Sequence, residues 1–206
     1  SQVGYMQFDQ TRESTTNRFG FNPDDSADLD NPNPDEILAP ENIGDTVDFQ
    51  DQTLNIDDYE GDVAVRGGYV QGDVRWRENW RFIAGVRRET ADFSALSFAQ
   101  AGDDVPGGFE DTRTLPSLAV TWKFRDDMQL RGAWGKTVSR PTLNELSPAF
   151  YFDPDSGEAF VGNEALDPAK ITAYDLRWEW FLSDTEQITA GVFAKDYTDP
   201  IERVLR

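Results

Sequence analysis

The residues of this chain that are best suited to bind a ligand gather between positions 151 and 163. Aromatic rings alternate there with carboxylates and an amide: Tyr151, Phe152, Asp153, Asp155, Phe160 and Asn163. Aromatic rings stack on the apolar faces of sugars, and carboxylate or amide oxygens accept hydrogen bonds from sugar hydroxyls. This pattern suits a carbohydrate site, and it suits equally a loop that packs its own aromatics.

Other chemistry has less support. The run from Asp153 to Glu158 has alternating oxygen ligands, as in part of a calcium loop, but it lacks the twelve-residue spacing and contains Pro154. Calcium is therefore the weaker interpretation, and no metal ligand is assigned. The chain has no Cys and no His, which excludes a thiol nucleophile, a Cys/His zinc site and a Ser-His-Asp triad. Asp175 and Glu179 would lie about 13 Å apart on a strand, beyond both glycosidase geometries. We expect no enzyme.

The elements that position these residues are predicted to be β-strands. Apolar and polar residues alternate with a period of two in about seven segments of roughly 10 to 13 residues. The alternation is seen at residues 70–76, 80–90, 113–124, 128–137, 172–182 and 188–195, and an opening strand is expected somewhere within 3–15. Their lengths are closer to the 9 to 11 residues of membrane-spanning strands than to the five or six of ordinary soluble strands.

The two faces of these strands differ in chemistry. Large aromatics beside the short turns are predicted to form a belt at the membrane surface: Trp76, Trp80, Trp122, Phe124, Trp178 and Trp180. Charged residues on the opposite face are predicted to line a lumen or contact a plug: Asp73, Arg75, Arg81, Arg87, Glu89, Lys123, Arg131, Asp175, Arg177 and Glu179. In a soluble sandwich the same tryptophans would fill a core between two sheets.

The charges are also sorted along the chain. Three stretches are predicted to be long acidic loops: residues 19–65, 97–111 and 141–169, which hold 24 of the 39 acidic residues and none of the 19 basic ones. Short turns of outer-membrane barrels face the periplasm and long loops face outside, so we expect residues 19–62 to be a long acidic extracellular loop, with a short helix at 35–38. Solubility alone would also explain such acidity. The sequence pI of about 4.2 argues against nucleic acid as a partner.

Residues 130–203 resemble the late barrel region of TonB-dependent outer-membrane receptors. The resemblance begins with Ser139-Arg140-Pro141 and Leu143-Asn144-Glu145-Leu146-Ser147-Pro148. It continues through Gly162-Asn163-Glu164-Ala165-Leu166-Asp167-Pro168, Tyr174-Asp175-Leu176-Arg177-Trp178-Glu179-Trp180 and Pro200-Ile201-Glu202. Upstream, Gly85-Val86-Arg87-Arg88-Glu89-Thr90 is similar to another strand of the family. We interpret these motifs as structural, serving turn chemistry and strand register, in preference to ligand contact.

The resemblance implies an all-β fold: an antiparallel up-and-down meander of about seven strands, forming part of a large transmembrane β-barrel in the bacterial outer membrane. We expect residues 1–206 to be a partial barrel domain, without the plug, the TonB box or the terminal strand, because such barrels close with 22 strands. The implied partners are outer-membrane lipid and, outside this chain, the plug and the TonB complex.

The implied function is active uptake, of an oligosaccharide by analogy with one subgroup, or otherwise of a ferric siderophore or similar ligand. The alternative is a soluble, secreted all-β binding module with carbohydrate- or calcium-dependent acidic loops. The two hypotheses differ in the exposure of Val120 and Leu176, which a membrane barrel exposes on its outside and a sandwich buries between its sheets.

Overall fold

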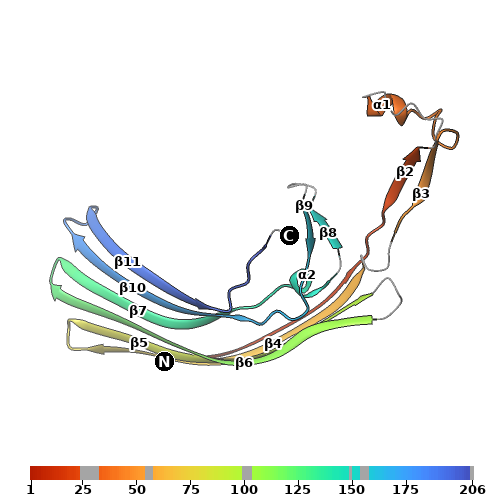
Figure 1. Ribbon diagram of the computed structural model, residues 1–206. Coiled ribbons are helices and arrows are strands. Elements are labelled where there is room, and N and C mark those ends of the chain that lie inside the picture. The colour runs from red at the N-terminus through yellow and green to blue at the C-terminus, as the bar shows by residue number, and fades with distance from the viewer. Residues whose placement is uncertain (24–32, 54–57, 99–103, 149, 154–157, 205–206) are drawn as a thin grey trace.

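The chain folds around one large antiparallel sheet, in a computed structural model that describes residues 1–23, 33–53, 58–98, 104–148, 150–153 and 158–204. Seven strands follow one another as a meander, confirming the predicted all-β class. In order across the sheet they are β1 (Gln2–Ser14), β4 (Tyr59–Trp76), β5 (Trp80–Phe98), β6 (Asp104–Arg125), β7 (Met128–Ser139), β10 (Ala169–Phe181) and β11 (Gln187–Thr198). The sheet curves like a section of a barrel wall (Figure 1).

The remaining elements all belong to connections at one end of the sheet. The hairpin of β2 (Phe19–Pro23) and β3 (Val47–Asp51), with α1 (Pro34–Ile37), projects away from the sheet. A second insertion contains α2 (Leu143–Leu146), β8 (Phe150–Asp153) and β9 (Glu158–Val161), and it lies on the concave side (Figure 1). At the other end, short turns join the strands. Asp127 O accepts a hydrogen bond from Phe181 N at 2.8 Å, which ties one turn to the neighbouring hairpin.

Strand register places the aromatic residues near the short turns in one row. Trp76 pairs with Trp80, Trp80 with Trp122, Trp122 with Leu130, and Leu130 with Trp178. The rings of Trp80 and Trp122 stack with centroids 5.2 Å apart. Phe124 and Trp180 extend this row toward the turns on the same face, because alternate residues of a strand share a face, and Trp180 Nε1 donates to Asp127 Oδ2 at 2.9 Å.

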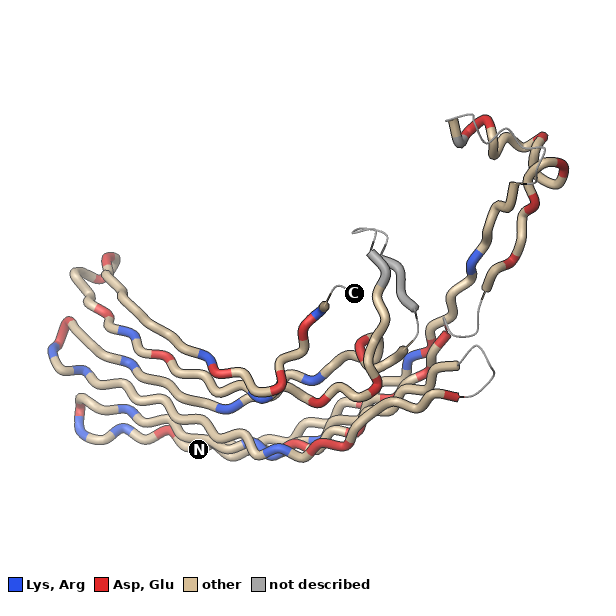
Figure 2. The backbone as a smooth tube through the Cα atoms, in the orientation of Figure 1, with Lys and Arg blue, Asp and Glu red and all other residues tan. Residues whose placement is uncertain are grey.

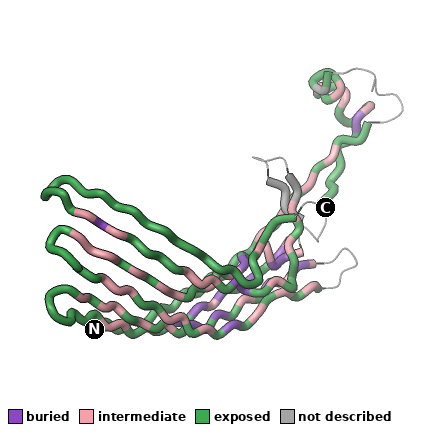
Figure 3. Tube along the Cα trace, turned by 60° about the vertical axis from the view of Figure 1, so that its left-hand side comes forward, coloured by how far each residue is buried: buried purple, intermediate pink, exposed green. Residues whose placement is uncertain are grey.

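The convex face of the sheet near the turns is apolar and uncovered. Trp76 is 53% exposed, Leu176 46% and Val192 67%, while Val120 is half-buried between its neighbours. In the described part of the chain, no second sheet packs against these side chains (Figure 3). The exposure agrees with the barrel hypothesis and contradicts the sandwich.

The buried core lies on the opposite face and at the opposite end. Tyr59, Val63, Val65, Ala91 and Ala95 of β4 and β5 pack against Leu143 and Leu146 of α2. Along β4 and along β5, the strand residues of this cluster are separated from the charged concave residues by an even number of positions. Alternate residues of a strand share a face, so both groups point to the concave side. The apolar face of β4, β5 and β6 therefore changes sides along the strand, from convex near the turns to concave near the loops.

This change of face explains two sequence expectations that are wrong. Strands β4, β5 and β6 contain 18, 19 and 22 residues, so the expected 10 to 13 is too short. The acidic composition of residues 97–111 indicates a loop, but all of those described belong to β5 or β6. The alternation continues there with its apolar members on the concave face, where Phe93 and Phe109 stack with centroids 4.7 Å apart.

The predicted loop at 19–62 is more structured than the composition implies. It includes the β2–β3 hairpin and α1, close to the helix predicted at 35–38, and residues 59–62 already belong to β4. Phe19, Phe21 and Phe49 form a small exposed stack on the hairpin. Hydrogen bonds from the side chain and then the backbone of Thr53 lower the pKa of Asp51, which keeps this carboxylate charged. Among the described residues, no helix is long and apolar enough to cross a bilayer.

Gly108 is a position where the sheet requires glycine. Its φ is +140°, and an added Cβ would lie 2.1 Å from the carbonyl oxygen of Phe93. We expect Gly108→Ala to lower the free energy of unfolding by about 1–3 kcal/mol, because both the backbone and the contact are strained. Urea unfolding of the full-length protein in detergent measures it. Gly72→Ala is the matched control, since a Cβ added at Gly72 would have no other atom within 4 Å, and equal stability of the two variants would contradict the assigned backbone.

Candidate functional site

Immediately after β7, the chain turns into the concave side and stays there. Pro141, which cannot continue a sheet ladder, is buried, and α2 follows it. The helix is short, but Glu145 Oε2 accepts hydrogen bonds from Thr142 N at 2.7 Å and Thr142 Oγ1 at 3.0 Å. This is the carboxylate half of a capping box, which satisfies the free backbone donors at a helix start. The motif therefore begins an inward-folded segment, residues 141–168, which we call the inner loop.

Glycines allow the inner loop to approach other backbone closely. A Cβ on Gly162 would lie 2.2 Å from Ser147 O and 2.6 Å from both Asn144 O and Glu145 O. Gly61 and Gly107 leave room in the same way, for Leu143 and for Leu146 O respectively. At Gly162 a side chain would collide with three carbonyl oxygens, whereas at Gly61 and Gly107 the neighbouring atoms would have to shift. The absence of side chains at these glycines lets the wall and the inner loop approach each other closely.

Hydrogen bonds complete the attachment of the inner loop. The hydroxyls of Ser97 and Ser147 are 2.6 Å apart in a buried contact between β5 and the end of α2. Tyr59 donates its hydroxyl proton to Asn144 Oδ1. Asn163 N donates to Glu145 O at 2.7 Å, so the second half of the motif closes onto the first.

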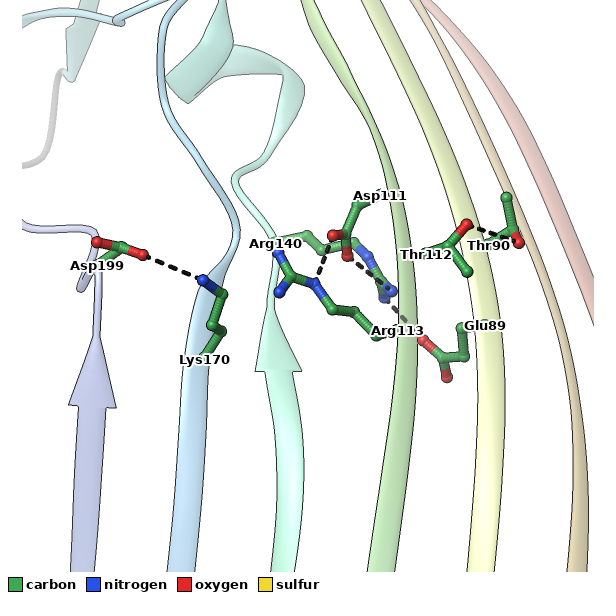
Figure 4. A network of polar contacts seen from close by, with 8 residues as sticks. All are labelled: Glu89, Thr90, Asp111, Thr112, Arg113, Arg140, Lys170 and Asp199. Carbon is green, nitrogen blue, oxygen red and sulfur yellow. Dashed lines mark hydrogen bonds and ion pairs between the residues drawn. The ribbon is translucent and has the colours of Figure 1, made fainter.

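Arg140 joins the inner loop to two strands of the wall. Its Nη1 lies 2.9 Å from Glu89 Oε2 on β5, and its Nη2 lies 3.8 Å from Asp111 Oδ2 on β6. Arg113 Nε also contacts Asp111 Oδ1, and Arg87 pairs with Glu89. Figure 4 shows Arg140 reaching across from the end of β7 to these carboxylates. Both carboxylates are buried, so each depends on its arginines for charge compensation.

Some hydrogen-bonding capacity of this network is unused. Arg140 Nε and Nη2, Arg87 Nε and Asp111 Oδ2 are buried and have no hydrogen-bond partner in the described part of the chain. Three of these atoms nevertheless have a charged neighbour: Arg87 Nε is paired with Glu89 Oε1, and Arg140 Nη2 lies 3.8 Å from Asp111 Oδ2. The unused capacity is therefore clearest at Arg140 and Asp111. Buried polar atoms are rarely left without partners, and these atoms all lie on the concave face.

A second polar cluster lies on the concave face near the short turns. Glu179 is buried, with Arg177 Nε 3.2 Å and Arg131 Nη1 3.6 Å from its Oε1, and Gln129 donates to its Oε2. Register explains the cluster, because Arg131 pairs with Arg177 and Gln129 with Glu179. Figure 2 shows charged positions distributed along the strands of the sheet.

Most of the other predicted lumen residues are exposed on the same face. Asp73 and Arg81 form a bidentate pair, with hydrogen bonds of 3.0 and 2.7 Å. Arg75, Lys123 and Asp175 are exposed, without an ion pair among the described residues. All ten residues predicted to line a lumen therefore share one face, and the structure gathers seven of them, Arg87 with Glu89, Asp73 with Arg81, and Arg131 and Arg177 with Glu179, into contacts.

The predicted ligand residues fall into three groups. Tyr151, Phe152 and Asp153 lie on β8, where only the backbone is described, and Asp155 lies outside the described residues. Phe160 lies on β9 beneath the guanidinium of Arg203, 4.3 Å from the ring centroid. Asn163 Oδ1 accepts from Ala165 N at 3.0 Å, within the turn that closes onto α2. No group of three or more metal-ligating side chains occurs among the described residues.

Sequence reasoning misses the roles of Arg140 and Asp111. In the sequence, Arg140 belongs to a motif that ends a strand, and Asp111 falls in an acidic stretch that resembles a loop. One signal is present: Arg140 is the last basic residue before an acidic stretch of 29 residues. The three-strand contact itself depends on register, which no local pattern contains.

Replacing Arg140 should destabilise the inner loop far more than replacing an exposed arginine. Arg140→Gln leaves Glu89 and Asp111 with less compensation, and breaking a buried pair costs about 3–5 kcal/mol. Chymotrypsin cleavage within residues 141–168 of the full-length protein measures release of the loop, which contains no Lys or Arg for trypsin. Arg81→Gln is the control, because its pair with Asp73 is exposed and contributes at most about 1 kcal/mol. Equal protection in both variants would refute the anchor.

Gly162→Ala should release the inner loop without unfolding the sheet. The added methyl would meet three carbonyl oxygens of α2 and the residue after it, and we expect a loss of roughly 1–3 kcal/mol, localised to the loop. Hydrogen exchange of residues 141–168 is the measurement. Gly135→Ala serves as the comparison, because its nearest contact would be an ordinary 3.6 Å. Unchanged exchange in Gly162→Ala would show that the close approach is absent.

Comparisons with known proteins agree with this architecture. The family model described as TonB dependent receptor-like, beta-barrel, matches residues 2–206. A solved structure titled as a double mutant of the Serratia marcescens hemophore receptor HasR, in complex with its hemophore HasA and heme, is similar with a TM-score of 0.52 at 11% sequence identity. The match covers 95% of this chain and 32% of that one, so the chain spans about a third of the solved receptor. No curated protein sequence matches.

The family match extends over nearly the whole chain and includes the seven-stranded sheet, which confirms the expected fold as part of a large barrel. Proteins of this family are receptors and transporters of the bacterial outer membrane, not enzymes. The protein described by this sequence and structure therefore belongs to the TonB-dependent receptor-like β-barrel family, and its sheet is a section of an outer-membrane barrel wall.

Proposed function

We propose that the protein is an active transporter that takes up an oligosaccharide across the outer membrane, with energy delivered through TonB. The observation that carries this proposal is the opposite chemistry of the two faces of one sheet. The convex face is aromatic and apolar near the short turns, as a lipid-facing wall requires. The concave face carries buried ion pairs and holds the inner loop, as the wall of a plugged lumen would.

The incomplete hydrogen bonding of Arg140 and Asp111 supports contact with a plug. In an intact transporter, a plug domain would occupy the concave side of this sheet and supply partners to these atoms. Arg131, Arg177 and Glu179 would form a second contact region closer to the periplasm. Both regions lie on the wall past which a ligand would move once the plug is displaced.

The acidity of the loops favours a neutral ligand. The three long acidic stretches contain no basic residue, so their electrostatic field repels anions and places no cost on a neutral polyhydroxylated molecule. The inner loop carries Tyr151, Phe152 and Phe160, whose rings suit stacking on sugars, and it is attached directly to the wall through Arg140. An oligosaccharide matches both features better than an anionic ferric siderophore does.

A growth experiment separates these ligand classes. A strain lacking the full-length gene should lose growth on one or more oligosaccharides supplied as limiting carbon source, and should grow normally with ferric siderophores as the iron source. Complementation with the intact gene should restore growth, and removal of its TonB box should prevent the rescue. Loss of growth only on a ferric siderophore would replace the proposed ligand with that class.

Replacing the aromatic residues of the inner loop tests their part in binding. Tyr151→Ala with Phe152→Ala should lower oligosaccharide affinity by about tenfold or more, because stacked rings contribute roughly 0.5–1.5 kcal/mol each beyond the area that they bury. Calorimetry on the full-length receptor measures the dissociation constant. Val161→Ala, an exposed apolar residue on the same hairpin, is the control. Unchanged affinity in the aromatic variant, with uptake intact, would place the ligand elsewhere in the barrel.

A further inference from the structure

Above the apolar band, the convex face changes to basic and hydroxyl side chains. Register places these residues on the same face as the tryptophan row. They are Arg66, Arg88, Lys136 and Lys170, with Thr90, Thr112, Thr114 and Thr172 between them. We call this set the basic belt. Across β4, β5, β6, β7 and β10 it contains no carboxylate, whereas on the edge strand β11 Asp196 pairs with Thr172 on the same face. Beyond the belt, Asp92 and Glu110 face each other.

The height of the basic belt matches the far edge of a bilayer. Arg88 follows Trp80 on β5 by eight positions, about 26 Å along the strand. With a strand tilt of 35–45° this is about 20 Å along the membrane normal, close to the apolar band of about 25 Å in outer-membrane barrels. The tryptophan row thus marks one surface of the membrane and the basic belt the other.

Because the strands are tilted, the residues of the basic belt lie at a similar height along the membrane normal. Relative to the tryptophan row, β4 ends at Trp76 itself, whereas β10 continues to Phe181, three residues beyond Trp178. The turns therefore step along the register from β4 to β10, as in a tilted barrel. By register, Arg66 lies two residues farther from the short turns than Arg88, and Lys136 lies two residues closer to them. This displacement from β4 to β7 has the same direction as the displacement of the turns.

The charges of the belt are available for a partner. Arg66, Arg88 and Lys136 are exposed and make no ion pair among the described residues. Arg88 Nη1 reaches only Thr114 Oγ1, at 3.4 Å, and Thr90 and Thr112 share a hydroxyl contact of 3.2 Å. Lys170 is less available, because it pairs with Asp199 at 3.6 Å. Arginine, lysine and threonine together supply the donors that phosphate oxygens accept.

An apolar groove lies directly beneath Lys136. It has a volume of about 550 Å³ and is lined on the convex face by Leu118, Gly132, Trp134, Tyr174, Leu176 and Val192. Gly132 forms its floor, since its missing side chain leaves a hollow between larger neighbours. Trp134 and Tyr174 pair across β7 and β10 at the upper end, one row below Lys136 and Thr172. The groove and the belt thus place an apolar channel next to free positive charge.

We propose that the basic belt binds the phosphate-bearing headgroup of an anionic lipid in the outer leaflet, with one acyl chain lying in the groove beneath Lys136. Two separate features of the convex face fit the two parts of such a molecule: cations and hydroxyls fit the phosphate, and the groove fits hydrocarbon. The proposal depends on the outer-membrane location and does not depend on which ligand the receptor transports.

The test uses the full-length protein in phosphatidylcholine nanodiscs that contain a low fraction of bisphosphorylated lipid A. Native mass spectrometry counts the bound lipid A and gives its apparent affinity. The triple variant Arg66→Gln, Arg88→Gln, Lys136→Gln should bind at least tenfold more weakly, because each cation near an anionic lipid surface contributes about a fivefold factor. Val192→Trp, which fills the groove, should weaken lipid A binding in the same assay with all charges retained.

The control removes the same number of charges from the concave face. Register places Lys195 of β11 opposite Ala173, on the concave face. Arg75→Gln, Lys123→Gln and Lys195→Gln should leave lipid A binding within twofold of the original protein. Lipid A without phosphates should bind the original protein as weakly as lipid A binds the belt variant. Equal binding by the belt variant and the original protein, or an equal loss in the control, would overturn the proposal. Competition by inorganic phosphate as effective as by lipid A would also overturn it, by showing an anion site only.

A second readout covers the case in which the belt variant folds poorly. In the original protein, affinity for lipid A should fall as salt rises from about 50 to about 500 mM, because exposed charges are screened. A salt-independent affinity would contradict the role of the belt. Transport ligand binding in detergent should be the same in the original protein and in the folded belt variant, so failure of this proposal is distinct from failure of the proposed function.

Discussion

The structure depends on which face of the sheet carries the apolar side chains of its long strands. That face changes near Arg140. On the turn side of this residue the apolar side chains of the sheet point outward, and on the loop side those of β4, β5 and β6 point inward against α2. The sheet contacts lipid on its convex face near the short turns and the inner loop on its concave face near the long loops. No one face of the sheet is therefore apolar along its whole length. Buried charge marks the crossover, where Glu89 and Asp111 meet Arg140.

This arrangement couples the wall to the inner loop, where we propose that the ligand binds. The inner loop begins directly after Arg140, which contacts two strands, and it closes onto itself through Gly162 and Asn163. Its hairpin lies above the concave face (Figure 1). The aromatic residues assigned to ligand binding are therefore connected to the wall by a short and well-anchored path.

The motifs that resemble the family acquire a physical explanation here. Ser139-Arg140-Pro141 provides the crossover charge and the strand end, and Leu143 and Leu146 fill the core that the inward-facing strand residues leave open. Gly162-Asn163 fits against the carbonyls of α2, where a Cβ would collide. The preference for a structural role over ligand contact agrees with these contacts. Asn163, proposed as a ligand residue, uses its side chain within the turn, which makes it the weakest member of that set.

The alternation of residues was enough to predict about seven strands and which aromatic and charged residues share a face, because a period of two is a local property of extended chain. The order of the strands as a meander came from the family resemblance. It was not enough to predict where strands end, because residues 97–111 alternate with the opposite face apolar and look like an acidic loop when charge is counted alone. Only the tertiary structure decided that α2 covers the upper concave face and that Arg140 spans three strands. Both facts depend on register between segments about 50 residues apart, and register is set by packing that no single strand contains.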